Sequence, residues 1–439
     1  MVFTKPVIQH SFVIKITLKN KTMKMKNLAI AAILLLTSAK INATDLCVAE
    51  NGAGGCYSTI TDAVNAAVNG DRIIINPKAG NAAYAENLTI TKSLQFLCNV
   101  EGGEYTMQGN ITITPAQSRI IVFIGMKNLQ GNMTATGNSP VGVRCKVSIM
   151  NCNFVNGNVN LDWDNFDVTI ASCVFLDGNI GIRYGKVIGN DINTISNYNS
   201  GYPNSYYRYS VYIGQDATAT NDSLQIVGNK ISYNGSVYAY QVAIMAYSAN
   251  QYYYITNNIL TGSSLSHGVY IAASKNSTIG RNTIVNNTIS VTAALNIGVS
   301  ITTVVNSSYD VINNLILATT GTGIAASGGG PVQVSYNLMS NPLVLSGITD
   351  DGTNNLSSNT TLDANNRPNN GSDAINGGSP DEAYYDINLT RNDAGAFGGS
   401  FTQDNFYPVT GAARVYFVRA PRKVTLGSTI NVKGDAFDR

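Results

Sequence analysis

The stretch Ile226-Val227-Gly228-Asn229-Lys230-Ile231 decides the fold, because its pattern returns along the chain. An aliphatic residue is followed three positions later by a small polar residue and five positions later by an apolar one. The matching triplets are Ile149/Cys152/Phe154, Ile170/Cys173/Phe175, Val187/Asn190/Ile192, Ile226/Asn229/Ile231, Ile255/Asn258/Leu260, Ile279/Asn282/Ile284, Val311/Asn314/Ile316 and Val334/Asn337/Met339. Successive triplets start 17 to 39 residues apart, which predicts a solenoid of stacked coils whose insertions fall in loops.

The small polar residue of each triplet predicts a sharp bend between two short strands. Asparagine tolerates the left-handed backbone that such a bend uses, and its amide can bond to the equivalent amide in the coils above and below. We therefore expect a stacked ladder in which cysteines stand for asparagine in the first two coils. Its predicted members are Cys152, Cys173, Asn190, Asn229, Asn258, Asn282, Asn314 and Asn337.

The chain is expected to divide into five parts around this all-β repeat. Residues 1–43 read as an upstream extension plus signal peptide, and residues 44–72 as an N-terminal cap that contains one short helix from Ser58 to about Asn69. Residues 73–345 form the parallel β-helix, 346–400 its loop-rich C-terminal end, and 401–439 a small C-terminal β segment. The helix has apolar residues at Ile60, Val64 and Ala67, a spacing typical of an amphipathic helix.

The N-terminus has the order of a secretion signal. Lys24 and Lys26 precede the apolar run from Leu28 to Leu36, and Ile41-Asn42-Ala43 reads as a cleavage site. The run is too short to span a membrane, so we expect a secreted protein, extracellular or on the cell surface, with the periplasm as an alternative. The segment 1–43 holds seven lysines and no acid, so its removal lowers the net charge from +2 to −5. A mildly acidic chain argues against nucleic acid as a partner.

Export also permits disulfides. Cys47 and Cys56 flank the turn-rich Asn51-Gly52-Ala53-Gly54-Gly55, and we predict a bridge between them. No cysteine or histidine spacing indicates a zinc site.

The chain resembles secreted bacterial right-handed parallel β-helix proteins of the pectate-lyase-like superfamily. The coil triplets carry this resemblance together with an N-terminal and a C-terminal stretch. These are Tyr57-Ser58-Thr59-Ile60 through Gly70-Asp71-Arg72-Ile73 with Tyr84-Ala85-Glu86-Asn87-Leu88, and Asp373-Ala374-Ile375-Asn376-Gly377-Gly378 with Arg391-Asn392-Asp393-Ala394-Gly395-Ala396-Phe397. The resemblance implies the fold over about residues 57–400 but leaves the activity open, because the superfamily includes lyases, hydrolases, epimerases and adhesins.

A polysaccharide lyase on this scaffold needs a base and a cation beside the uronate. The candidates are His267, the one histidine outside the leader, with Lys275 and Arg281 nearby in sequence. Aligning the coils on their second apolar mark puts His267 in one column with Tyr209 and Tyr240. The alternative is that His267 is a half-buried ladder residue and that both cations are surface charges. The paired aspartates of pectin hydrolases are missing from the preceding coil ends, so the hydrolase pattern fails.

Alternating acids surround Trp163 at Asp162, Asp164 and Asp167. Carboxylate oxygens together with backbone carbonyl oxygens can bind Ca²⁺, so calcium is the cofactor that the sequence suggests. The spacing lacks the glycine and the terminal glutamate of a dedicated calcium loop, and a solvated turn is the alternative.

Tyrosines are the strongest functional signal in the sequence. They gather in the longest insertion and in the coils after it, and flat amphipathic rings suit carbohydrate stacking or protein contact. The candidate carbohydrate-binding residues are Tyr202, Tyr206, Tyr207, Tyr209, Tyr240 and Tyr247; the alternative is that tyrosine is simply a good strand residue. We therefore expect a monomeric, non-catalytic protein that binds polysaccharide, with a lyase acting on an acidic glycan and an adhesin contacting protein as the other hypotheses.

Overall fold

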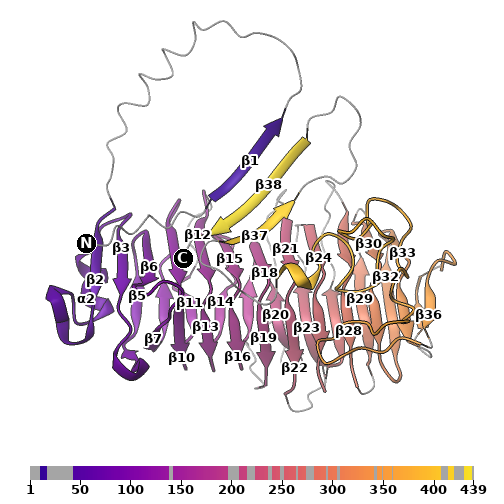
Figure 1. Cartoon of the computed structure of the whole chain (residues 1–439), viewed down its shortest axis with the longest axis horizontal. Coiled ribbons are helices and arrows are strands. Elements are labelled where there is room, and N and C mark those ends of the chain that lie inside the picture. The colour runs from indigo at the N-terminus through magenta and orange to yellow at the C-terminus, as the bar shows by residue number, and fades with distance from the viewer. Residues whose placement is uncertain are drawn as a thin grey trace, which may run out of the picture.

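The computed structural model describes residues 10–16, 43–137, 142–195, 207–214, 223–235, 240–247, 252–263, 265–272, 281–292, 295–303, 307–340, 344–348, 350–357, 359–406, 414–419 and 430–437. It is a right-handed parallel β-helix, an elongated stack of coils that starts at the N-terminal helix and ends near β36 (Figure 1). Each coil contributes one strand to each of three parallel sheets, because a short strand can pair only with its equivalents in the coils above and below.

Sheet I is made of the strands that come directly before the bend that holds the ladder residue. We call this bend the asparagine corner. Within the described residues it contains β2 (Asp45–Val48), β3 (Arg72–Ile75), β6 (Leu94–Cys98), β9 (Ile120–Ile124), β12 (Cys145–Met150), β15 (Phe166–Ala171), β18 (Gly185–Ile188), β21 (Ser223–Val227), β24 (Tyr252–Thr256), β27 (Asn282–Val285), β30 (Tyr309–Ile312) and β33 (Val332–Ser335). Because β2 already belongs to sheet I, the segment 44–72 that we expected to be a cap also supplies a strand.

Sheet II follows that corner. Its described strands are β4 (Tyr84–Ala85), β7 (Tyr105–Gln108), β10 (Met126–Leu129), β13 (Asn153–Val155), β16 (Val174–Leu176), β19 (Asp191–Thr194), β22 (Lys230–Tyr233), β25 (Ile259–Thr261), β28 (Thr288–Ser290), β31 (Leu315–Leu317), β34 (Leu338–Ser340) and β36 (Asn355–Ser357).

Sheet III closes each coil. Its described strands are β5 (Leu88–Ile90), β8 (Ile111–Ile113), β11 (Met133–Ala135), β14 (Val159–Leu161), β17 (Ile180–Ile182), β20 (Tyr207–Ile213), β23 (Tyr240–Tyr247), β26 (His267–Ala272), β29 (Ile297–Thr303), β32 (Thr322–Gly328) and β35 (Val344–Ser346). The described helices are short: η1 (Glu50–Gly55), α2 (Ile60–Ala66), η2 (Ala79–Asn81) and η3 (Gln403–Asn405).

The core is a set of stacked columns of like residues. The aliphatic position of the triplet aligns from Ile149 to Ile170 to Val187 in sheet I, and all three are fully buried. In sheet II the rings of Phe154 and Phe175 stack with centroids 4.8 Å apart. Inward residues alternate with outward ones along each strand, so stacking the coils buries one continuous apolar interior.

The asparagine ladder is present, and its register corrects one predicted member. Each amide nitrogen donates to the amide oxygen of the next coil, for example from Asn229 to Asn258 at 2.9 Å. Asn258 donates to Asn287 at 2.9 Å and Asn287 to Asn314 at 3.0 Å. The predicted rung Asn282 is therefore wrong. The ladder runs through Cys152, Cys173, Asn190, Asn229, Asn258, Asn287, Asn314, Asn337 and Asn354.

Asn282, five residues before the ladder residue Asn287, has a different structural role. It begins β27, where its side-chain oxygen accepts a hydrogen bond from the Tyr253 backbone amide at 2.8 Å and its amide donates to the Ser308 carbonyl at 3.2 Å. It is buried at the start of a sheet I strand, before that strand reaches the ladder corner.

The left-handed residue of the bend is also one position earlier than predicted. Asn257, Asn286 and Asn313 have φ between 54° and 59°, and in the coils before them Gly189 and Gly228 have φ of 60° and 64°. The ladder residue itself follows this bend, which leaves its side chain free to point into the stack. Cys173 fits the ladder because its thiol donates to the Ile149 and Ala171 carbonyls at 3.4 Å.

The N-terminal cap is held by two charged side chains from the first coil. Thr59 caps α2 by accepting from the Asp62 amide at 3.0 Å, and Glu86 accepts from the Ile60 and Thr61 amides at 2.9 and 2.7 Å. At the other end Lys92 donates to the last carbonyls of the helix, including that of Ala67 at 2.7 Å. These contacts satisfy groups that a helix leaves unpaired at its ends, and they end α2 earlier than the predicted Asn69.

The predicted bridge between Cys47 and Cys56 is confirmed. It closes the loop that contains η1, directly before the helix.

A second asparagine ladder, absent from the sequence prediction, lies where sheet II turns into sheet III. Asn110 accepts from the Asn132 amide at 2.9 Å, and Asn158 accepts from the Asn179 amide at 2.9 Å. A glycine precedes each of these asparagines, and at Gly131 a Cβ would lie 1.9 Å from the carbonyl oxygen of Gly109. The full set is Asn87, Asn110, Asn132, Asn158 and Asn179.

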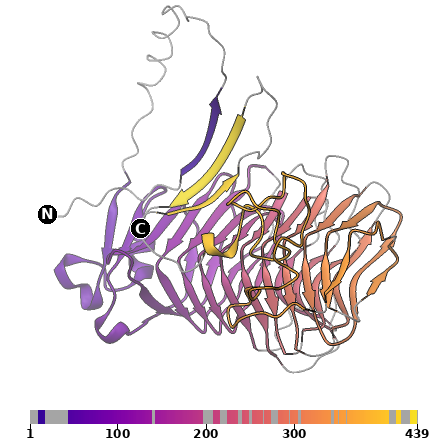
Figure 2. The same cartoon turned by 45° about the vertical axis from the view of Figure 1, so that its right-hand side comes forward.

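The expected loop-rich end folds back over the corner between sheets I and II. This return segment, residues 372–406, crosses the C-terminal half of the stack (Figure 2). The corner amides of Asn257 and Asn286 donate to its carbonyls at Ala396 and Asp393, both at 3.0 Å. Phe406 ends the segment over the corner glycines, where a Cβ at Gly228 would lie 2.2 Å from its ring.

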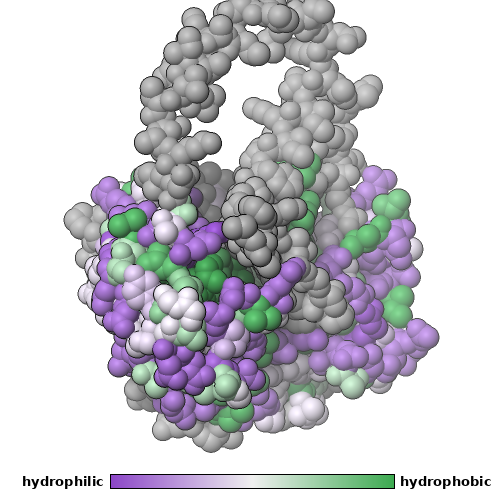
Figure 3. Space-filling view, turned by 60° about the vertical axis from the view of Figure 1, so that its left-hand side comes forward, coloured by the Kyte–Doolittle hydropathy of each residue, from purple (hydrophilic) through white to green (hydrophobic). Residues whose placement is uncertain are grey.

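The outer face of sheet I carries an apolar stripe that continues from Phe406. Its buried members are Leu97, Val122, Ile124, Met150, Ala171, Ile188 and Val227. Figure 3 views the N-terminal side and shows apolar residues gathered in a hollow of a mainly polar surface.

A small antiparallel sheet of β1 (His10–Ile16), β38 (Ile430–Phe437) and β37 (Arg414–Arg419) lies beside sheet I (Figure 1). Lys186 of β18 forms an ion pair with Asp435 of β38. β1 belongs to the segment predicted to be removed as a leader, and that removal stays a prediction.

Candidate functional site

The middle of sheet III carries the largest group of aromatic side chains that the sequence singled out. In β26 two consecutive residues face the core: Val269 is buried, and a Cβ at Gly268 would lie 2.6 Å from Ile289 Cδ1. This bend leaves His267 and Tyr270 on the outer side, with ring centroids 5.5 Å apart in an edge-to-face arrangement. An aromatic pair is thus held on the outer face by a bend in the strand beneath it.

The same arrangement repeats in the two preceding coils. Tyr209 and Tyr212 of β20 stack with centroids 4.7 Å apart and pack against Val242 and Met245 of β23 and against Tyr270. We call these five residues, together with Tyr240 and His267, the aromatic cluster. Its inner members Tyr209, Tyr212 and Met245 are buried, whereas Tyr240 is 38% exposed and Tyr270 is partly exposed.

His267 is fixed within this cluster. It is 4% exposed, its Nδ1 lies 3.0 Å from Ser266 Oγ, and its ring tilts against Tyr240 with centroids 5.6 Å apart. Ser266 Oγ also accepts from the Gln241 amide and donates to the Gln241 carbonyl, both at 2.8 Å. Burial lowers the pKa of His267 from its ordinary value to about 4, because desolvation disfavours the charged imidazolium. His267 is therefore neutral near pH 7.

The predicted column of Tyr209, Tyr240 and His267 needs a correction. In the register Tyr209 aligns with Val242 and Val242 with His267, while Tyr240 aligns with Tyr207. Tyr240 still reaches His267 through its ring. Tyr207 and Tyr247 lie in β20 and β23, and their side chains lie outside the described part of the structure. Tyr202, Tyr206 and Lys275 also lie outside the described residues.

Arg281 does not join His267 in any described contact. It precedes β27 of sheet I, where its guanidinium forms an ion pair with Asp310 at 2.6 Å and its Nη2 donates to the Tyr309 carbonyl at 3.3 Å. The structure therefore places Arg281 in a contact between sheet I strands, on a different sheet from the histidine.

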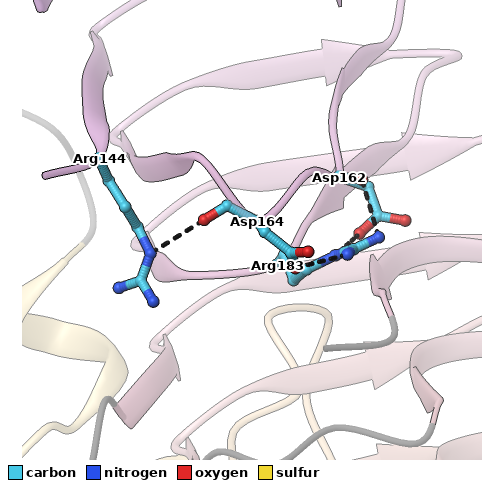
Figure 4. A network of polar contacts seen from close by, with 4 residues as sticks. All are labelled: Arg144, Asp162, Asp164 and Arg183. Atoms are coloured by element: carbon cyan, nitrogen blue, oxygen red, sulfur yellow. Dashed lines mark hydrogen bonds and ion pairs between the residues drawn. The ribbon is translucent and has the colours of Figure 1, made fainter. Parts of the chain in front are cut away.

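Two of the three aspartates that suggested a calcium site converge on an arginine (Figure 4). Arg183 Nε donates to Asp162 at 3.0 Å, its Nη1 donates to Asp164 at 2.6 Å, and its Nη2 donates to the Asp162 carbonyl at 3.1 Å. The Asp164 carbonyl accepts from Arg144 at 3.1 Å. Burial, only partly offset by Arg183, raises the pKa of Asp162 to about 6.

Asp167 lies apart from this group, in β15 beside Lys146. Within the described residues no group of three or more His, Cys, Asp or Glu side chains could hold a metal ion. Calcium binding by these aspartates stays a prediction. The arrangement is not a solvated turn, and it does not include Asp167. It is a half-buried ion-pair cluster in which the guanidinium supplies the positive charge.

The N-terminal half of sheet III presents a polar row that the sequence analysis did not identify. Thr89, Thr112 and Thr134 align in adjacent strands, and each alternates with residues of the core. Asn160 and Gly181 continue the row toward Tyr212. The signal was present as Leu88-Thr89-Ile90-Thr91, Ile111-Thr112-Ile113-Thr114 and Met133-Thr134-Ala135-Thr136.

No family model matches the chain, and no curated protein matches it. Among solved structures it is similar to the pectate lyase Pel9A, with a TM-score of 0.45 and 14% identity over 82% of this chain and 98% of that chain. It is also similar to the Dettilon tailspike protein, with a TM-score of 0.29 and 12% identity over 84% of this chain and 87% of that chain. The fold assignment itself follows from the three parallel sheets and their register. No helix in the described part is long and apolar enough to cross a membrane.

Proposed function

We propose that this protein is exported and binds a polysaccharide along the outer face of sheet III without catalysing a reaction. The observation that carries the proposal is the aromatic cluster. Its exposed edge, Tyr240 and Tyr270, lies on the paired strands β23 and β26, and the row from Thr89 to Asn160 lies farther along the same face. Aromatic rings pack against the apolar faces of sugars, and hydroxyl and amide groups bond to sugar hydroxyls. The predicted leader sequence and the Cys47–Cys56 bridge support export.

The state of His267 supports binding over lyase chemistry. A general base works best when its pKa lies near the operating pH, whereas burial holds the pKa of His267 at about 4. Its Nδ1 also contacts Ser266, and Arg281 is engaged with Asp310. The cluster therefore suits a ring-stacking role better than proton abstraction.

The proposal can be tested by affinity electrophoresis of the purified protein through gels that contain individual polysaccharides. We expect retardation by at least one polysaccharide and a weaker effect in Tyr240→Ala and Tyr270→Ala variants. An aromatic contact is worth about 0.5–1.5 kcal/mol, so the affinity should fall about two- to twelvefold. Tyr57→Ala is the matched control, because Tyr57 is 37% exposed, as Tyr240 is 38% exposed, but lies in the N-terminal cap.

Failure of the wild-type protein to bind any polysaccharide would refute the proposal. The appearance of unsaturated uronate absorbance during incubation with pectate or alginate would favour the lyase alternative. A Tyr240→Ala variant that binds as well as wild type, while Tyr57→Ala loses affinity, would place the site elsewhere.

A further inference from the structure

We infer that the polysaccharide bound by sheet III is uncharged. This inference rests on the proposed function and deepens it by naming the class of ligand. The outward row that runs from Thr89 in β5 through Tyr270 to Ser346 in β35 contains no charged side chain among the positions that the structure describes. Tyr212 and Met245 of this row are buried, so an acidic glycan at its exposed members would meet only hydroxyl, amide, aromatic and small side chains.

The charged groups described at the edge of this face are already paired. All three guanidinium nitrogens of Arg183 donate to Asp162 or Asp164. A uronate or sulfate would have to break this cluster to gain a cation, and its carboxylate partners would then repel the incoming anion. Burying a charge without a partner is strongly unfavourable, so the edge cluster opposes acidic ligands.

Arg208, the one lysine or arginine within the described strands of sheet III, is withdrawn from the face. Arg208 of β20 is 6% exposed and lies near Tyr233, whose pKa it lowers while burial raises that pKa to about 12. His267 adds no charge near pH 7, because burial lowers its pKa to about 4. Among the described residues, this face of sheet III therefore offers no positive charge that is available to bind an acidic glycan.

Neutral sugars need what the face does offer. Thr112, Thr134 and Asn160 are partly exposed hydrogen-bonding groups spaced by one strand separation, about 4.8 Å. Tyr240 and Tyr270 supply ring surface. A neutral chain of hexoses, with hydroxyls at its edges and CH groups on its faces, matches this division.

The inference is tested by measuring affinity for neutral polysaccharides (a β-glucan, a mannan and a xylan) and for acidic ones (pectate and alginate). Affinity is measured at about 20 mM and at about 500 mM NaCl, because this rise in salt shortens the Debye length from roughly 20 Å to roughly 4 Å. We expect binding to a neutral polysaccharide with an affinity that changes less than about twofold between the two salts, and acidic binding at least about tenfold weaker.

A charge-introduction variant locates the contact. Ser300 aligns with Tyr270 on the same row, so Ser300→Lys should create salt-dependent affinity for pectate or alginate. Ser232→Lys is the matched control, because Ser232 lies in β22 of sheet II, and it should leave acidic binding unchanged.

The possible failures are distinguishable. Tight acidic binding by the wild-type protein that weakens at high salt would overturn the inference while leaving polysaccharide binding intact. Binding to no polysaccharide would overturn both. Equal gains in Ser300→Lys and Ser232→Lys would show that the gain reflects net charge and would refute the assignment of the contact to sheet III.

Discussion

Replacing Asn287 by alanine should destabilise the protein about twice as much as replacing Asn282. The Asn287 amide donates to the Ile255 and Val285 carbonyls and to Asn314, at 3.0, 3.2 and 3.0 Å. Its oxygen accepts from the backbone and side-chain amides of Asn258 at 3.0 and 2.9 Å. Two of the donor contacts share one hydrogen, so alanine removes about four independent hydrogen bonds. At about 1 kcal/mol each, the loss is about 4 kcal/mol.

Asn282 provides the matched comparison, because it is equally buried and only five residues away. It makes two side-chain hydrogen bonds, to the Tyr253 amide and the Ser308 carbonyl, so Asn282→Ala should cost about 2 kcal/mol. Urea denaturation of both variants, followed by far-ultraviolet circular dichroism, gives the difference in unfolding free energy. Native-state hydrogen exchange at the Asn258 amide reports the local effect, because that amide loses its acceptor only in Asn287→Ala. An equal or larger loss for Asn282→Ala would refute the ladder register.

Three further outcomes follow from single contacts. Cys173→Asn should stabilise the protein by about 1 kcal/mol, measured by urea denaturation, because an amide oxygen would replace the sulfur that now accepts from the Cys152 amide at 3.4 Å; destabilisation would show that the site has no room for the amide. Arg183→Gln should lower the unfolding free energy by about 3–5 kcal/mol at pH 7.5, because it leaves the half-buried Asp162 and Asp164 without their partner. This loss should shrink near pH 5, because the pKa of Asp162 is about 6 and its carboxyl group is then largely protonated. A loss that does not change with pH would contradict this account. Burial raises the pKa of Asp386 to about 6, although hydrogen bonds from Gly399, Asp393 and Thr390 lower it. The folded protein therefore binds this proton more readily than the unfolded chain does, and the unfolding free energy should rise as the pH falls from about 7 toward 5. Asp386→Asn should remove that part of the pH dependence in thermal melts, and an unchanged profile would assign it to other groups.

The sequence predicted the coil because the triplet has a direct physical cause at each position. An aliphatic residue faces the core, a small polar residue enters the ladder, and an apolar residue starts the next sheet. It failed at one coil because two triplets fit equally well there: Ile279/Asn282/Ile284 and Ile284/Asn287/Ile289. Only the length of the preceding loop separates them, and loop length has no sequence pattern of its own.

The candidate site was less predictable than the fold because it depends on contacts between coils. Arg183 reaches Asp162 across one coil, and the sequence alone does not state which residues of successive coils align. The Tyr240 column failed for a related reason: Val242 and Ile244 both fit the second apolar mark of that coil, and the register aligns Ile244 with Val211 and Val269. The second asparagine ladder could have been found, since Gly109-Asn110, Gly131-Asn132, Gly157-Asn158 and Gly178-Asn179 repeat within the first coils.

The placement of insertions explains why sheet III is the face to test. From β12 to β34 every passage from sheet I to sheet II leaves two residues between the strands, as Gly189 and Asn190 do between β18 and β19. One residue makes the left-handed bend and the next joins the ladder, so an insertion there would break both. The passages into and out of sheet III in the coils after β19 vary in length from coil to coil. Added segments in these coils therefore flank sheet III, which makes its outer face the surface that sequence change can shape without loss of the stack.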